Sequence, residues 1–124
     1  MSAPESWSAF LAERPLAVVS TVSSDGMPHA VPVEIVIHEG HAYVWCHRSS
    51  VKARNVIREG RAAIVAYKGH AFVLIRGKAR MLEPDDPSYT AITQMFLDKY
   101  ERTEAFGNDA LIQITPDRIV KGTG

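Results

Sequence analysis

Apolar residues alternate with other residues along much of the chain, at the two-residue period of a β-strand. The clearest case is the segment Val31–His38, in which Val31, Val33, Ile35 and Ile37 occupy every second position. Further apolar stretches predict strands at Leu16–Val22, His41–Cys46, Arg61–Tyr67, Phe72–Leu82 and Leu111–Val120. The pattern therefore predicts six strands.

The apolar period changes to that of a helix in three places. Helices are predicted over Ser2–Glu13, over 49–59 and from Asp86 to Tyr100. The second helix has the best-defined ends, because serine precedes it and Gly60 stands where a left-handed C-terminal residue belongs. The third carries an apolar stripe formed by Tyr89, Ile92, Phe96 and Tyr100.

The order of these elements is α-β-β-β-α-β-β-α-β, and most strands follow one another as hairpins. Strands joined in this way pair antiparallel. Gly77, inside a long strand, predicts a bulge or bend. We therefore expect an α+β fold: a small, six-stranded, mostly antiparallel split β-barrel whose ends and side are covered by the helices.

Composition narrows the class of protein. The 124 residues match the length of one domain, so we expect residues 1–124 to form a single cofactor-binding domain. Apolar residues make up 46% and charged residues 23%, as in ordinary soluble globular proteins. The 14 basic and 14 acidic side chains give a net charge of zero, which removes the positive excess typical of nucleic-acid binding. No apolar run approaches the length of a membrane span.

Cysteine content and the first residues indicate the compartment. A single cysteine, Cys46, excludes an internal disulfide and a zinc cluster built from cysteines. Cys46 ends an apolar strand, so we expect it to pack as a small hydrophobic side chain. The first residues have neither the basic nor the apolar segment of a signal peptide, so a cytoplasmic location is expected.

The segment from His47 to Val56 carries Arg48, Lys52 and Arg54 and no acidic residue. It crosses a predicted strand-to-helix junction, which puts Lys52 and Arg54 in or near the first helical turn. Cations destabilise this turn, because the helix dipole places partial positive charge there. A bound anion such as a phosphate would explain the pattern. The alternative is a basic, solvated helix face.

No other motif assigns a chemistry. The histidines, at positions 29, 38, 41, 47 and 70, lack the spacings typical of a metal site, and no metal is expected. The nucleophile-elbow, phosphate-loop and dinucleotide-binding motifs are absent. No catalytic residue is therefore assigned.

Five short segments form a set when they are taken in order. They are GMPHAVPV at 26–33, YVWCHRSSVK at 43–52, KARNVIREGRA at 52–62, GKAR at 77–80 and ITPDR at 114–118. The first two resemble a strand entry and a Ser-x-Lys helix start in the split-barrel flavin-binding superfamily typified by pyridoxamine 5′-phosphate oxidase. The third is similar to the signature of the branch that uses the deazaflavin coenzyme F420. The last two fit that superfamily's glycine-bearing and closing strands.

This resemblance implies a set of cofactor contacts. Lys52 would pair with the cofactor phosphate, with Ser50 and Val51 beside it. Phe72 falls near the position where the oxidase has a glutamine facing the ring. The complete implied set is Val31, Pro32, Val33, Cys46, His47, Arg48, Ser50, Val51, Lys52, Arg54, Asn55 and Phe72.

The resemblance also implies a function: an F420-dependent oxidoreductase that transfers a hydride to an electron-poor small molecule, acting as a homodimer with the cofactor sites in the interface. Phe72 cannot donate a hydrogen bond as the oxidase's glutamine would. Val31 or a neighbour stands in place of the arginine that the oxidase uses beside its flavin phosphate, which favours F420 over FMN. Two alternatives remain. One is an FMN-binding split-barrel reductase, and the other is a non-catalytic carrier of flavin, deazaflavin or haem.

Overall fold

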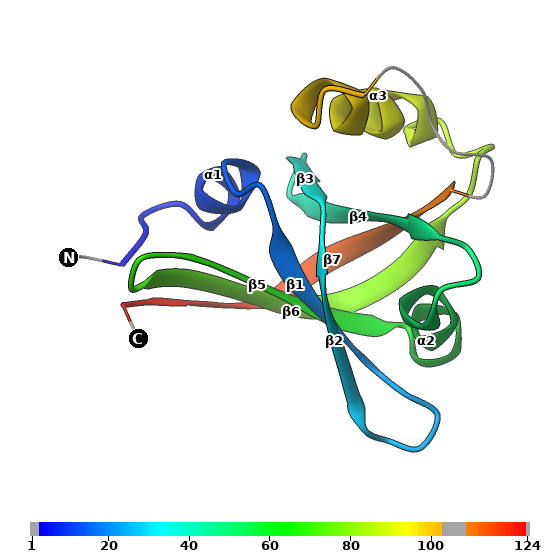
Figure 1. Ribbon diagram of the computed structural model, residues 1–124, viewed down its shortest axis with the longest axis horizontal. Helices are drawn as coiled ribbons and strands as arrows, with labels where there is room; N and C mark the ends of the chain where they lie inside the picture. Colours follow the sequence, from blue (N-terminus) through cyan, green and yellow to red (C-terminus); the bar gives the residue numbers. More distant parts are fainter. Residues whose placement is uncertain (1–2, 103–108, 124) are drawn as a thin grey trace.

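The computed structural model describes residues 3–102 and 109–123. Within them the chain forms α1 (Trp7–Ala12), β1 (Ala17–Val22), β2 (Pro28–Val33), β3 (Ile35–His38), β4 (His41–His47), α2 (Val51–Glu59), β5 (Arg61–Lys68), β6 (Ala71–Leu82), α3 (Tyr89–Lys99) and β7 (Asp109–Gly122) (Figure 1). All strand pairs are antiparallel, in the order β2-β1-β5-β6-β7-β4-β3. The sheet curls around a core, which confirms the predicted α+β split-barrel fold.

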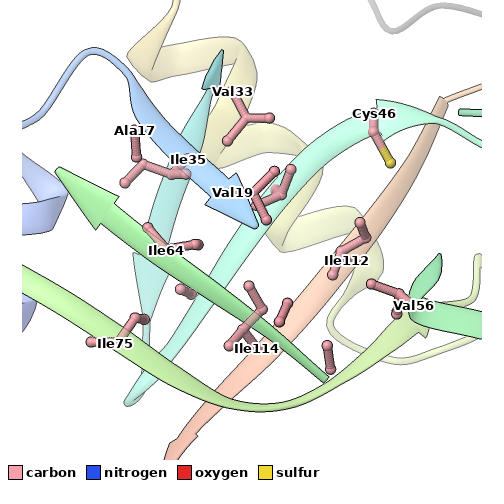
Figure 2. Close-up of a cluster of buried hydrophobic side chains, with 14 of the residues drawn as sticks. Ala17, Val19, Val33, Ile35, Cys46, Val56, Ile64, Ile75, Ile112 and Ile114 are labelled. Atoms are coloured by element: carbon pink, nitrogen blue, oxygen red, sulfur yellow. The ribbon is translucent and has the colours of Figure 1, made fainter. Parts of the chain in front are cut away.

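The main core fills the inner side of the curled sheet. Alternate residues point inward, so that β1, for example, shows a strict alternation of buried and half-buried positions. Figure 2 shows these inward side chains, which include Val19, Ile35, Ile64, Ile75, Ile112 and Ile114. Leu11 of α1 and Ala53 and Val56 of α2 join the same cluster, so two helices seal this core.

A second cluster lies on the outer side of the sheet, beneath α3. Phe96 is fully buried there, with its ring 5.2 Å from Trp45 edge-on and 6.1 Å from Tyr100 in a stacked arrangement. Val36 and Leu111 complete the contact with β3 and β7. The predicted apolar stripe of this helix is therefore confirmed as its packing face.

The predicted strand Val31–His38 is wrong as a single element. The strand is interrupted at Glu34, so that residues 3–102 and 109–123 form seven strands rather than six. The reason is that the two halves have different partners: β2 pairs with β1, and β3 pairs with β4. At this interruption the Glu34 carboxylate accepts a hydrogen bond from Arg102 at 2.8 Å.

Several predicted details are confirmed and two helix starts are shifted. Ser50 caps α2 and Gly60 follows it with φ of +68°. The bulge occurs between Arg76 and Gly77, where a Cβ on the glycine would overlap the backbone oxygen of Thr115 in β7. The first and third helices begin later than predicted, at Trp7 and Tyr89.

Candidate functional site

The junction between β4 and α2 is held by the backbone and by Ser50. The Ser50 N–H donates to the carbonyl of His47 at 3.0 Å, and its side-chain oxygen accepts from the Ala53 N–H at 3.3 Å. No acidic residue lies in the first turn of α2. The amides of Val51 and Lys52 belong to the helix N–H groups that have no intrahelical acceptor. The start of α2 therefore presents positive potential with no acidic side chain of its own to balance it.

Cationic side chains at this junction differ in their pairing. Arg48 forms an exposed ion pair with Glu83, at 3.6 Å. Among the described residues, no hydrogen bond or ion pair involves the side chain of Lys52 or of Arg54. Lys52 is half-buried and Arg54 is exposed. Two cations without partners thus stand where the helix dipole disfavours them, which is the arrangement that an anion would stabilise.

Cys46 and His47 are neighbours with opposite environments. The Cys46 side chain is buried in the main core, as Figure 2 shows, and His47 is exposed. Burial raises the pKa of the Cys46 thiol, and the hydrogen bond with Ser50 and the charge of Lys52 do not offset this effect. A protonated, buried thiol is neither a nucleophile nor a metal ligand at neutral pH.

Asn55 lies inside the molecule, with only 3% of its surface exposed. Its amide nitrogen donates to the Thr21 hydroxyl at 3.0 Å, and its oxygen accepts from Arg58 at 3.0 Å. Arg58 also donates to the carbonyl of Val22. Both polar atoms of Asn55 are thus occupied in fastening α2 to β1, and the predicted contact with a cofactor remains a prediction.

Val31, Pro32 and Val33 form the second half of β2. Val33 is buried, Val31 packs against the core, and Pro32 is exposed on the outer face. Because β2 is the terminal strand of the sheet order, one of its edges has no strand partner among the described residues. Proline suits such an edge, since it lacks an N–H. The predicted contact of these three residues with a cofactor ring stays a prediction.

Phe72 does not lie at the start of α2. It stands near the beginning of β6, opposite Gly122 of β7, whereas α2 meets β6 near Ala79, which donates to the carbonyl of Gly60 at 2.9 Å. Seven residues of strand separate Phe72 from Ala79, roughly 23 Å. The predicted residues of β4 and α2 thus form one continuous segment around the junction, whereas Phe72 lies near the other end of β6.

Sequence reasoning missed a cavity of about 500 Å³ on the outer face of the sheet, lined in part by Arg61, Arg76 and Lys78. Arg61 is distant in sequence from the other two, and the register of the β5–β6 hairpin places it opposite Lys78. The short turn between the two strands was visible in the sequence. Extending the pairing from that turn would have placed Arg61 opposite Lys78.

Metal-binding and membrane-spanning features can be assessed for residues 3–102 and 109–123. In these ranges no three His, Cys, Asp or Glu side chains gather closely enough to hold a metal ion. No helix within them has the length and apolar character needed to cross a membrane.

Comparison with known families identifies the class of protein. Residues 3–121 match the pyridoxamine 5′-phosphate oxidase family, so the chain belongs to that family. None of the curated protein sequences matches it.

Solved structures show the same fold at low sequence identity. A candidate pyridoxamine 5′-phosphate oxidase from Listeria innocua is 22% identical, with a TM-score of 0.76 over 94% of each chain. The haem storage protein HutZ from Vibrio cholerae is 18% identical, with a TM-score of 0.77 over 94% of this chain and 92% of HutZ. An F420 reductase is also 18% identical, with a TM-score of 0.74 over 94% of this chain and 98% of the reductase.

Proposed function

We propose that the chain is an F420-dependent oxidoreductase that binds the cofactor phosphate at the start of α2. The observation that carries this proposal is the pair of cations, Lys52 and Arg54, that have no described partner beside a helix start with no acid in its first turn. Ammonium and guanidinium groups together with helix N–H groups are the donors that hold a phosphate. The donor set therefore fits a phosphate-bearing cofactor.

The roles of this chain's residues follow from their positions. Lys52 would pair with the phosphate. The side-chain oxygen of Ser50 caps the Ala53 N–H, and the N–H groups of Val51 and Lys52 would be left for the phosphate. The unpaired edge of β2 would align the ring through its backbone. When bound, a deazaflavin supplies a carbon that donates or accepts a hydride. The contribution of the protein is then to position the two reactants and to exclude water from them.

Phe72 supports the proposal that the working unit is a homodimer. Phe72 lies seven residues along β6 from Ala79, where α2 meets this strand, or roughly 23 Å away. A cofactor site that uses both Phe72 and α2 therefore needs Phe72 from a second copy of the chain. Such an interface could use an apolar row on the outer face of the sheet, in which each residue pairs with the next across neighbouring strands. The row consists of Pro32, Val18, Val65, Leu74 and Val120.

Titration with F420 and with FMN, followed by absorbance and fluorescence, tests the proposal. We expect saturable binding of F420, and Lys52→Ala should weaken it by about 1–3 kcal/mol through loss of a charge-assisted contact. Lys68→Gln, which removes a cation from the far end of β5, is the matched control and should bind as the wild type does. Tight binding of FMN without binding of F420, or unchanged affinity in Lys52→Ala, would contradict the assignment.

A carrier is the second candidate. It is favoured by the haem storage protein among the structural neighbours and by the lack of an assigned proton donor near α2, where the Cys46 thiol is buried. Incubation with reduced F420 and a panel of enones and quinones distinguishes the two functions. Oxidation of the cofactor that depends on the second substrate supports the enzyme, and tight binding without turnover supports the carrier.

A further inference from the structure

The cavity on the outer face of the sheet lies near the β1–β2 hairpin, away from the start of α2. Its lining includes Arg61 of β5, Arg76 and Lys78 of β6 and Asp117 of β7. Arg61 directly follows Gly60 at the end of α2, whereas Lys52 lies in its first turn. The nine residues of α2 separate the two places by roughly 13 Å.

The strand register places like charges directly opposite each other at this cavity. Arg61 pairs with Lys78 across β5 and β6, and Arg76 pairs with Arg118 across β6 and β7. Like charges in directly opposed positions destabilise a sheet. Arg61 has an ion pair with Glu59 at 3.5 Å, but Arg76 and Lys78 have none among the described residues. Repulsion thus persists at this end of the hairpin, and a bound anion would relieve it.

Small residues keep the space between these cations open. Ser20, Ala63 and Arg76 are neighbours across three strands, so a hydroxyl and a methyl group lie beside the guanidinium. Gly77 has no side chain and cannot acquire one, because the backbone of β7 occupies the position of a Cβ. The small lining residues therefore leave a hollow between the cationic side chains.

We propose that this cavity is a second binding site, specific for a phosphate monoester and separate from the start of α2. Even with Asp117 in the lining and Glu59 paired to Arg61, the cations at the cavity keep a positive excess, which suits the charge of about −2 on a phosphate monoester near neutral pH. The guanidinium groups of Arg61 and Arg76 can each donate two parallel hydrogen bonds to phosphate oxygens. Asp117 can accept from a hydroxyl or amino group on the organic part of the ligand.

Amide chemical shifts of the ¹⁵N-labelled full chain test the proposal residue by residue. Glycerol 3-phosphate, with inorganic phosphate as the simpler probe, should move the amides of Gly77 and Ala63 saturably, whereas sodium chloride of equal ionic strength should not. Lys78→Gln and Arg76→Gln should each weaken this response about tenfold or more. Lys68→Gln removes the same charge from the opposite end of the hairpin and should leave the response unchanged.

Two further results separate this site from the one at α2. Lys52→Ala should retain the shifts at Gly77 and Ala63, because Lys52 does not line the cavity. Without phosphate and at low salt, Lys78→Gln should melt no lower than the wild type, since it removes the repulsion with Arg61. The proposal is overturned if the shifts at Gly77 vanish in Lys52→Ala, persist in Lys78→Gln and Arg76→Gln, or appear equally with sodium chloride.

Discussion

The outer side of the sheet has two halves that differ in what covers them. On β3, β4 and β7, α3 packs against the strands and leaves Tyr43 only 2% and Trp45 only 8% exposed. On β1, β5 and β6, the corresponding outward side chains, such as Val65 and Leu74, remain partly exposed. We refer to these as the covered half and the open half.

Outward-facing apolar side chains have different roles in the two halves. In the covered half the outward side chains complete a core, so their burial stabilises the fold. The open half carries an apolar row and, beginning two residues along the same strands, the cationic cavity. The partly exposed row adds less to the stability of one chain than a buried core does, and the opposed cations reduce that stability. Surface of this kind is typical of binding and association.

The largest predicted difference between the halves is in stability. Phe96→Ala, in the covered half, should lower the free energy of unfolding by about 3–5 kcal/mol, because it empties a fully buried ring position. Leu74→Ala, in the open half, should cost well under half as much, since the leucine is partly exposed already. Urea denaturation of both variants measures this. Equal losses would show that the open half is also a core.

A smaller loss is predicted where α2 is fastened to the open half. Asn55→Ala should lower the free energy of unfolding by about 1–3 kcal/mol, because it leaves the buried Thr21 hydroxyl without its partner. Arg54, the preceding residue of α2, is exposed, so Arg54→Ala should change stability by less than about 0.5 kcal/mol. The same urea titrations compare the two. If Arg54→Ala costs as much, the bond between Asn55 and Thr21 is not what fastens the helix.

Self-association is the predicted role of the apolar row. Leu74→Asp should weaken association of two copies about tenfold or more, because it places a charge in a desolvated contact. Sedimentation velocity over a range of concentrations measures this. Gln94→Asp, on the exposed side of α3, adds the same charge outside the row and serves as the control. A wild-type chain that sediments as a monomer throughout would refute the proposed dimer.

Much of the fold was accessible from the sequence because local chemistry and long-range packing agree. Ser50, Gly60 and Gly77 each perform the role that their residue types predict. The break at Glu34 was not accessible, because its cause is a change of strand partner rather than any local signal. Alternation alone cannot distinguish one long strand from two shorter ones that continue in the same direction.

The site was predictable where it is continuous in sequence and not where it depends on burial. The cations at the start of α2 follow directly from the segment between β4 and α2. Asn55 lies in that segment too, but only the structure shows that its side chain turns inward to Thr21. The cavity on the open half depends on strand register, so no single motif contains it.

The smallest predicted effect concerns pH and belongs to the covered half. Lys99, at the end of α3, donates to the carbonyl of Ile35 at 2.7 Å. Burial, together with the charge of Arg14, lowers the pKa of Lys99 to about 8, although Glu34 acts in the opposite direction. In the unfolded chain this lysine keeps its proton to higher pH. The unfolded state therefore binds more protons above about pH 8, and stability should rise with pH there.

Comparison of the wild type with Lys99→Met isolates this contribution. Burial raises the pKa of Cys46 and of Tyr100, and these groups lower stability at higher pH, so the window is kept between about pH 7.5 and pH 9. Across it, the wild type should gain up to about 1 kcal/mol relative to Lys99→Met, a modest figure because the partly exposed amine is screened by solvent. Urea midpoints at matched ionic strength measure the difference. Parallel pH profiles would mean that α3 closes over the sheet without desolvating this amine.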